Sequence, residues 1–336
     1  MKNLRNKTFG HKVGTYLFLS LLTASIISCS SDDGYYNVIE DEFNPPSAAQ
    51  FNDLRETALE QHTETAIFNA EDGITFTSND NAVLTIHPGC LMQNGEQASG
   101  EVELTFIDIY NREDMLPTNK PVMGRLPNGD KAMLITGGEF FIEVRKDGEL
   151  LDLGCSLQLL VPGDNTGGVD NEMILWDGII DEAGNLTWEE MDLDEEGGNA
   201  GIMVEGEHYY SYFKSFGWTN IDKFYSDPRD KTTMQVKLPE GFDDTNSAVY
   251  LSYDGEPNAL AQLDTFDDVS KIFSEHYGQI PIGLEVHIIF TSAEGDNWRY
   301  AIQGVTIEEN AIYTFTLEET EVATENELKV ALEVLP

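Results

Sequence analysis

Residues 101–109 read Glu-Val-Glu-Leu-Thr-Phe-Ile-Asp-Ile. Apolar side chains at Val102, Leu104 and Phe106 alternate with polar ones, and this period of two predicts a strand with one buried face. Similar runs recur along the chain, and turns rich in Gly, Asn, Asp and Pro separate them. Strands are predicted at 67–68, 74–77, 83–86, 101–109, 139–145, 157–161, 173–176, 186–188 and 208–214, with a hairpin loop at 181–185.

A polar segment, Ser226-Asp227-Pro228-Arg229-Asp230, interrupts this pattern, and we place a domain boundary there. Beyond it, strands are predicted at 232–238, 248–253, 285–291, 300–307, 312–317 and 328–334, and one helix at 266–273. About six strands in about a hundred residues are typical of a β-sandwich. The predicted fold class is therefore all-β, with two mostly antiparallel, β-sandwich-like domains at 66–228 and 229–336.

The N-terminal 28 residues differ in character from the rest of the chain. They contain no acid, and four basic residues precede an apolar run at 13–27; the basic residues are Lys2, Arg5, Lys7 and Lys12. A basic segment followed by a short apolar one is typical of a secretory signal peptide. The run is too short, and contains too many Ser and Thr residues, for a bilayer-spanning helix.

The apolar run ends at Ser28-Cys29. Together with Ile26, these residues resemble the lipobox of bacterial lipoprotein precursors, in which Ile27 takes the place of the usual small residue. The resemblance implies that Cys29 becomes the acylated first residue of the mature chain, and several acyl chains anchor a protein stably to a membrane. The alternative is a soluble exported protein with an incidental cysteine.

The residues after Cys29 are Ser30-Ser31-Asp32-Asp33. They resemble the Ser/Asp-rich export signal of surface-exposed lipoproteins of the Bacteroidota, which implies a location on the outer face of the outer membrane. The alternatives are an ordinary acidic linker and a lipoprotein that faces the periplasm.

Residues 29–65 are predicted to be an acidic tether that ends in one short helix. Pro45-Pro46 disfavours helix. Ser47 and Gln50 fit a capping box, and apolar residues follow at helical spacing: Phe51, Leu54, Ala58 and Leu59. We expect this helix to pack its apolar side against the domain that follows.

Two longer segments carry a further resemblance. Residues 134–144 read Leu-Ile-Thr-Gly-Gly-Glu-Phe-Phe-Ile-Glu-Val, and residues 216–225 read Phe-Gly-Trp-Thr-Asn-Ile-Asp-Lys-Phe-Tyr. They resemble a group of uncharacterised Bacteroidota lipoproteins with a β-rich domain followed by a sandwich-like tail. A looser similarity to ZU5-like β domains points to structural or interaction roles. These resemblances imply location and fold, and no activity.

Trp218, Asn220 and Asp222 alternate along one predicted strand, so they share a face. An aromatic ring beside two hydrogen-bonding groups would suit a ligand platform of the kind that sugar binders use. The alternative is a structural corner, in which Trp218 and Phe224 pack into the core and the polar residues bond loop backbone.

Catalytic signatures are missing from the sequence: it has no His-Glu-x-x-His, Gly-x-Ser-x-Gly, Walker or Cys-x-x-Cys motif. A hydrolase with paired carboxylates stays open, since acids are abundant. Cys90 and Cys155 either form a disulfide in an oxidising compartment or remain two buried thiols. We expect no cofactor other than a calcium ion.

The net charge is −42, with 61 acidic and 19 basic residues, and this balance excludes a binder of nucleic-acid phosphates. Residues 147–213 contain 17 acids and no Lys or Arg. Their Gly-rich loops offer the oxygen ligands that Ca²⁺ prefers. The weak calcium candidates are Asp164, Asp170, Glu172, Asp192 and Asp194. The alternative is a solvated acidic surface.

The sequence therefore predicts a non-catalytic, lipid-anchored protein of the outer membrane and cell surface, with a binding or structural role. A glycan and an envelope protein are both candidate partners. The alternatives are an accessory subunit of an outer-membrane uptake or secretion complex, and a secreted hydrolase that uses carboxylates.

Overall fold

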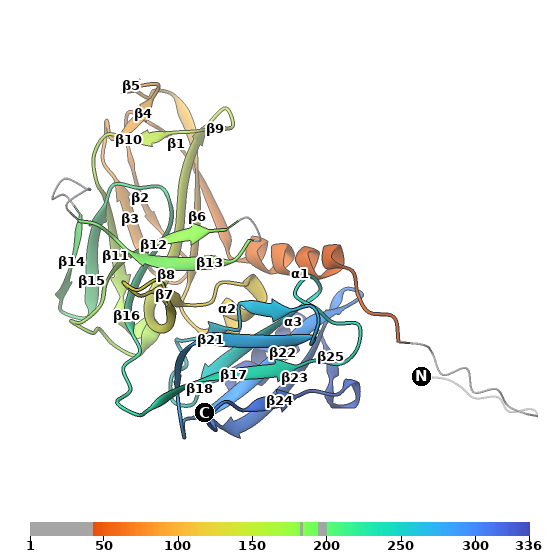
Figure 1. The fold of residues 1–336 in the computed structure, drawn as a ribbon. Coiled ribbons are helices and arrows are strands. Elements are labelled where there is room, and N and C mark those ends of the chain that lie inside the picture. The colour runs from red at the N-terminus through yellow and green to blue at the C-terminus, as the bar shows by residue number, and fades with distance from the viewer. Residues whose placement is uncertain (1–42, 182–183, 194–199) are drawn as a thin grey trace, which may run out of the picture. The chain divides into compact units, whose positions relative to one another are not determined.

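A computed structural model describes residues 43–181, 184–193 and 200–336, of which Asn44–Pro336 form one compact unit (Figure 1). The signal peptide, Cys29 and the 30–33 segment lie outside the described residues. The predicted all-β class is confirmed, because the described chain is dominated by five sheets of mainly antiparallel strands. None of the helices in the described part combines the length and the apolar character needed to cross a membrane.

The predicted helix after the tether is confirmed as α1 (Ala48–Gln61). Both bonds of the capping box are present, since the Gln50 backbone N–H donates to the Ser47 hydroxyl and the Ser47 N–H donates to the Gln50 side chain. Phe51 and Ala58 are buried. Phe51 packs edge-on against Trp298, with ring centroids 6.0 Å apart, so α1 rests on the C-terminal sheets.

The largest sheet has the strand order β1-β6-β8-β16-β12-β13-β7. β9 (Glu149–Leu150) pairs with the end of β8, and the other strands are β1 (Thr63–Asn69), β6 (Glu101–Ile109), β7 (Met123–Arg125), β8 (Lys131–Lys146), β12 (Ile174–Ile180), β13 (Leu186–Glu190) and β16 (Gly217–Phe224). β7 pairs with both β13 and β8. The strands β8, β16, β12, β13 and β7 therefore close into a ring.

A second sheet packs against the first. Its order is β14 (Gly201–Glu205), β15 (His208–Phe213), β11 (Leu157–Pro162), β3 (Val83–Ile86) and β2 (Ile74–Thr77). Apolar residues of both sheets meet in one core, among them Leu104 and Phe140 from the first and Leu84 and Leu159 from the second. The alternation in 101–109 thus points its apolar side into this core.

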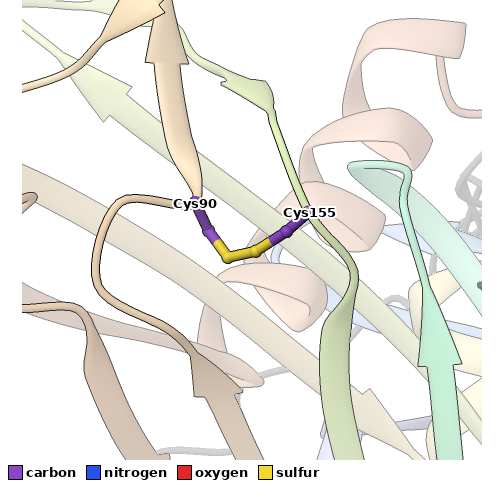
Figure 2. Close-up of a disulfide and its surroundings, with 2 residues drawn as sticks. All are labelled: Cys90 and Cys155. Carbon is purple, nitrogen blue, oxygen red and sulfur yellow. A yellow bond between two sulfur atoms is a disulfide. The ribbon is translucent and has the colours of Figure 1, made fainter.

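A disulfide joins Cys90 and Cys155, which lie beside a small sheet of β10 (Asp152–Leu153), β4 (Leu91–Gln93) and β5 (Glu96–Gln97) (Figure 2). Their Cα atoms are 5.1 Å apart across a sequence separation of 65 residues. Cys90 is buried and Cys155 is exposed, so the arrangement of two buried thiols is not found.

Two sheets follow the predicted boundary at residue 228. One has the order β20 (Thr265–Asp267), β21 (Ile272–Pro281), β17 (Lys231–Lys237) and β24 (Ile312–Thr314). The other has the order β19 (Ala261–Gln262), β18 (Ser247–Tyr253), β22 (Glu285–Glu294), β23 (Asn297–Thr306) and β25 (Glu321–Ala323). The boundary itself stays a prediction.

The helix predicted at 266–273 is wrong, because these residues form the β20–β21 hairpin. The Asp267 carboxylate accepts hydrogen bonds from the N–H groups of Val269 and Ser270, and Lys271 adopts a φ of 57°. This Asx-type turn satisfies the backbone locally and competes with a helix.

The strand predicted at 328–334 is also wrong, because α3 (Glu325–Glu333) occupies this segment. A capping box of Thr324 and Glu327 starts the helix, and Leu328 and Leu332 are buried one turn apart. A further helix, α2 (Arg112–Thr118), begins at the N-cap Asn111. The described residues thus contain three α-helices, of which the sequence predicted only α1, in addition to the 3₁₀ turns η1 (Gly163–Thr166) and η2 (Leu317–Glu319).

Hydrogen bonds from backbone and side-chain groups connect the segments on either side of residue 228. The Thr136 N–H donates to the Asn258 carbonyl at 3.0 Å, and the Asn258 amide donates to the Thr136 carbonyl at 2.6 Å. The Arg112 side chain is buried and donates to the carbonyls of Leu332 and Pro336 at 3.2 and 3.1 Å, and also to that of Leu335. These contacts hold α2 and β8 to the C-terminal sheets.

Candidate functional site

The predicted ligand platform on β16 is buried. Asn220 and Asp222 are 0% exposed and Trp218 is 9% exposed. Trp218 contacts Phe141 of β8 and Trp188 of β13, with ring centroids 5.4 and 6.5 Å apart. The structure does not present these side chains to a ligand, because their shared face points into the closed ring of strands.

A glycine lets the aromatic side chains meet inside the ring. Gly178 of β12 lies between Trp218 and Trp188, and a Cβ atom there would stand 2.4 Å from the Trp218 Cβ and 2.9 Å from the Trp188 ring. Trp176 packs edge-on against Phe224 at 5.1 Å, and its ring N–H donates to the Asp222 carbonyl at 3.0 Å. Trp218 and Phe224 pack against other aromatic rings, as the structural-corner alternative expects. The side chains of Asn220 and Asp222 bond each other, where that alternative expects bonds to loop backbone.

A β-bulge sets the position of the polar side chains. The register of β8 and β16 shifts between Asn220 and Asp222, where Gly137 and Gly138 oppose one residue. The Thr136 hydroxyl accepts from the Gly138 N–H and donates to the side-chain amide oxygen (Oδ1) of Asn220, both at 2.8 Å. The Asn220 amide donates to Asp222 at 2.6 Å. The Gly-Gly pair quoted from the sequence is thus the bulge that organises this cluster.

Two carboxyl groups, Glu139 and Asp222, are enclosed in the cluster. Both are 0% exposed. Among the described residues, neither Glu139 oxygen nor the Asp222 Oδ1 has a hydrogen-bond partner. Burial and the nearby Asp222 charge raise the pKa of Glu139 well above its usual range, and burial likewise raises the pKa of Asp222. Burial therefore favours the protonated form of both acids.

Lys120 lies at the edge of this cluster. It follows Asn119, whose φ of 54° ends α2, and it is 7% exposed. Its Nζ donates to the Thr118 carbonyl at 3.1 Å and lies 5.2 Å from the centre of the Trp218 ring. Burial lowers the pKa of Lys120 to about 8; the Glu139 charge opposes this shift and the Arg55 charge adds to it.

Arg55 of α1 is the second cation of the site. Its Nη2 donates to the Tyr250 hydroxyl at 3.1 Å, and that hydroxyl donates to the Asn119 side chain at 2.6 Å. The guanidinium carbon lies 4.0 Å above the Phe51 ring. Its Nε is buried and has no hydrogen-bond partner among the described residues.

A cavity of about 240 Å³ opens beside both cations. It is lined by Asn52, Arg55, Glu56, Leu59, Thr118, Asn119, Lys120 and Gly184. A second cavity of about 300 Å³ shares Asn52 and Arg55 with it and extends to Asn185 and Asp264. We call the first of these the Arg55–Lys120 cavity. Sequence reasoning missed it, because α1 and the end of α2 are far apart in the chain.

Of the calcium candidates, Asp170 and Glu172 contact the Lys223 ammonium at 2.6 and 3.4 Å, so a side-chain cation already occupies the space between them. Asp164 lies in η1, Asp192 follows β13, and Asp194 is outside the described residues. In the described part of the chain, no group of three His, Cys, Asp or Glu residues is placed to hold a metal ion.

Comparison with known proteins adds no relative: no protein-family model matches the chain, and no curated protein matches it either.

Proposed function

We propose that this protein is a non-catalytic lipoprotein of the outer membrane, exposed at the cell surface, which binds a small ligand. The observation that carries the binding role is the Arg55–Lys120 cavity, whose lining contains polar side chains and two cations in a chain of net charge −42. One wall of the cavity is α1, the first element after the predicted tether. The helix that follows the anchor would then take part in binding as well as in packing.

The non-catalytic part of the proposal rests on the enclosure of the acid pair. A carboxylate hydrolase needs both acids within reach of substrate and water. Glu139 and Asp222 are fully buried, and neither lines the Arg55–Lys120 cavity or the second cavity that shares Asn52 and Arg55 with it. Hydrolysis of a polysaccharide or peptide by the pure protein, lost in Glu139→Gln, would refute this part.

Lipid anchoring is tested by labelling cells with an alkyne fatty acid. We expect the wild-type chain to carry the label and Cys29→Ala to lack it, since Cys29 is the proposed acylation site. Cys155→Ala is the matched control and should be labelled like wild type. A labelled Cys29→Ala chain would overturn the lipoprotein assignment.

Surface exposure is tested by external protease on intact cells. Replacing Asp32 and Asp33 by Ala should protect the chain, because the Ser/Asp segment is the proposed export signal. Replacing Asp41 and Glu42 by Ala removes the same charge from the tether and should leave cleavage unchanged. Equal cleavage of both variants would favour an ordinary acidic linker. A stable membrane complex recovered after mild crosslinking would favour the accessory-subunit alternative.

A further inference from the structure

The two cations of the Arg55–Lys120 cavity lie close enough for the Arg55 charge to oppose protonation of Lys120. Neither forms an ion pair within the described residues, whereas eight other basic side chains do; these are Arg125, Lys131, Arg145, Lys223, Arg229, Lys271, Arg299 and Lys329. In a chain with 61 acids, two cations that line one cavity and form no ion pair within the described residues are an unusual arrangement.

Burial makes this arrangement costly. Lys120 is 7% exposed, and its Nζ has one carbonyl partner, so most of its hydration is lost. The neighbouring Glu139 charge opposes this cost, but burial raises the pKa of Glu139 and so weakens its contribution. An anion bound in the cavity would stabilise both cations at once.

We propose that the Arg55–Lys120 cavity binds the carboxylate of a small organic monoanion. This inference rests on the proposed binding function and names its ligand class. The Arg55 guanidinium supplies a planar donor pattern that matches a carboxylate, and Lys120 supplies a point charge. The amides of Asn52 and Asn119 line the same space and offer hydrogen bonds to hydroxyl groups.

The remaining charge of the protein selects a monoanion over a dianion. Every additional negative charge on a ligand is repelled by the net charge of −42, and Glu56 stands in the cavity wall. The volumes of about 240 and 300 Å³ for the two cavities that share Asn52 and Arg55 suit a molecule of about the size of a sugar acid.

Other cavities of similar size lack this charge pattern. The cavity of about 350 Å³ on another side of α1 is lined by Asp53 and Asp296 and by no cation. The cavity of about 270 Å³ beside β1 and β6 contains Arg145, but that side chain already pairs with Glu143. Of these cavities, the Arg55–Lys120 cavity alone combines two cations that form no ion pair within the described residues.

The test is calorimetric titration of the full-length protein with glucuronate, with glucose as the neutral match and with sulfate as a dianion, all at one ionic strength. We expect glucuronate to bind more tightly than sulfate, and glucose not to bind. Lys120→Met and Arg55→Gln should weaken glucuronate binding at least about tenfold, the loss of one charge-assisted hydrogen bond. Lys237→Met removes an exposed cation elsewhere and should bind like wild type.

Each contrary outcome is decisive. Absence of glucuronate binding, equal binding of glucose, or full binding by folded Lys120→Met would overturn the proposal. Arg55→Lys keeps the charge and loses the planar fork, so it provides a second variant should Arg55→Gln fail to fold. The labelling of Cys29 is independent of all these results.

Discussion

At the scale of single residues, stability depends most on the carboxyl groups that are buried without a full set of hydrogen bonds. Glu139 and Asp222 illustrate the general rule that burial disfavours the charged form of an acid. Asp108 and Glu275 follow it as well, because burial raises the pKa of Asp108 to about 6 and that of Glu275 to about 7. For an acid with a raised pKa in the folded state, folding takes up protons. Stability is therefore fully present below the unfolded-state pKa and is lost as pH rises through the folded-state pKa.

We predict that the free energy of unfolding falls as the pH rises from about 5 to 8, since the unfolded chain releases the protons of these acids at lower pH than the folded protein does. Glu139→Gln removes one such group and should gain about 1–3 kcal/mol relative to wild type at the upper end of this range. Urea unfolding at about pH 5 and about pH 8 measures this gain. As a control, the exposed Glu101→Gln should differ from wild type by the same free energy of unfolding at both pH values. If the free energy of unfolding changes with pH equally in wild type and in Glu139→Gln, the prediction is contradicted.

The bulge residue Gly138 gives a second prediction at this scale. Its φ is 136°, and a Cβ atom there would lie 2.6 Å from the Phe140 ring and 2.7 Å from the Tyr110 ring. Gly138→Ala should destabilise the protein by about 2–4 kcal/mol, because strain and overpacking add. Gly148→Ala also has a positive φ, but it meets no atom within 4 Å and should cost about 1 kcal/mol. Equal losses would show that steric contact at Gly138 is unimportant.

Among the secondary-structure elements, α2 and α3 depend on each other through Arg112. This side chain is 2% exposed and donates to backbone carbonyls at the end of α3 and to the Ser252 hydroxyl. Arg112→Met should lower the free energy of unfolding by about 2–4 kcal/mol, because buried carbonyls lose their donors. Arg125→Met breaks an exposed pair with Glu189 and should cost less than about 1 kcal/mol. Thermal or urea unfolding separates the two variants.

The disulfide joins Cys90 to Cys155 and so closes the chain between them into a loop. Closing a loop of 65 residues limits the unfolded ensemble, so the Cys90→Ser/Cys155→Ser double variant should lose about 2–4 kcal/mol. Chemical unfolding with and without a reductant measures this. Wild type should respond to the reductant and the double variant should not. A reductant effect of equal size on both would assign the loss to another cause.

For the whole molecule, the dominant property is the net charge of −42. Repulsion among surface acids opposes the compact state, and salt screens it. Raising NaCl from about 0.01 to 0.15 M shortens the screening length from about 30 to 8 Å and should raise Tm at neutral pH. The gain should shrink at about pH 4.5, where many carboxylates are protonated. If added NaCl leaves Tm unchanged at both pH values, repulsion among the surface acids contributes little to the stability of the protein.

Local signals were sufficient for much of the fold. The capping box at Ser47–Gln50 is formed between neighbours in the chain, and the alternation in 101–109 marks which side chains enter a core, so both appear in the structure as predicted. The predictions for 266–273 and 328–334 are wrong, because a short apolar run fits the period of a helix as well as that of a strand. The Asx turn at Asp267 decides the first segment, and the burial of Leu328 and Leu332 on one side of α3 decides the second. α2 escaped detection because it spans only seven residues.

Sequence alone determined the all-β class, the acidic character and the signal-peptide pattern, because composition and periodicity are properties of the chain itself. Tertiary structure alone decided that the face of Trp218, Asn220 and Asp222 is turned inward, and that Glu139 pairs with Asn220 across β8 and β16, close enough for the Asp222 charge to raise its pKa. It also brought Arg55 and Lys120 to one cavity, although 64 positions separate them in the chain. Ring closure and helix packing set these positions, and both depend on contacts between residues remote in sequence.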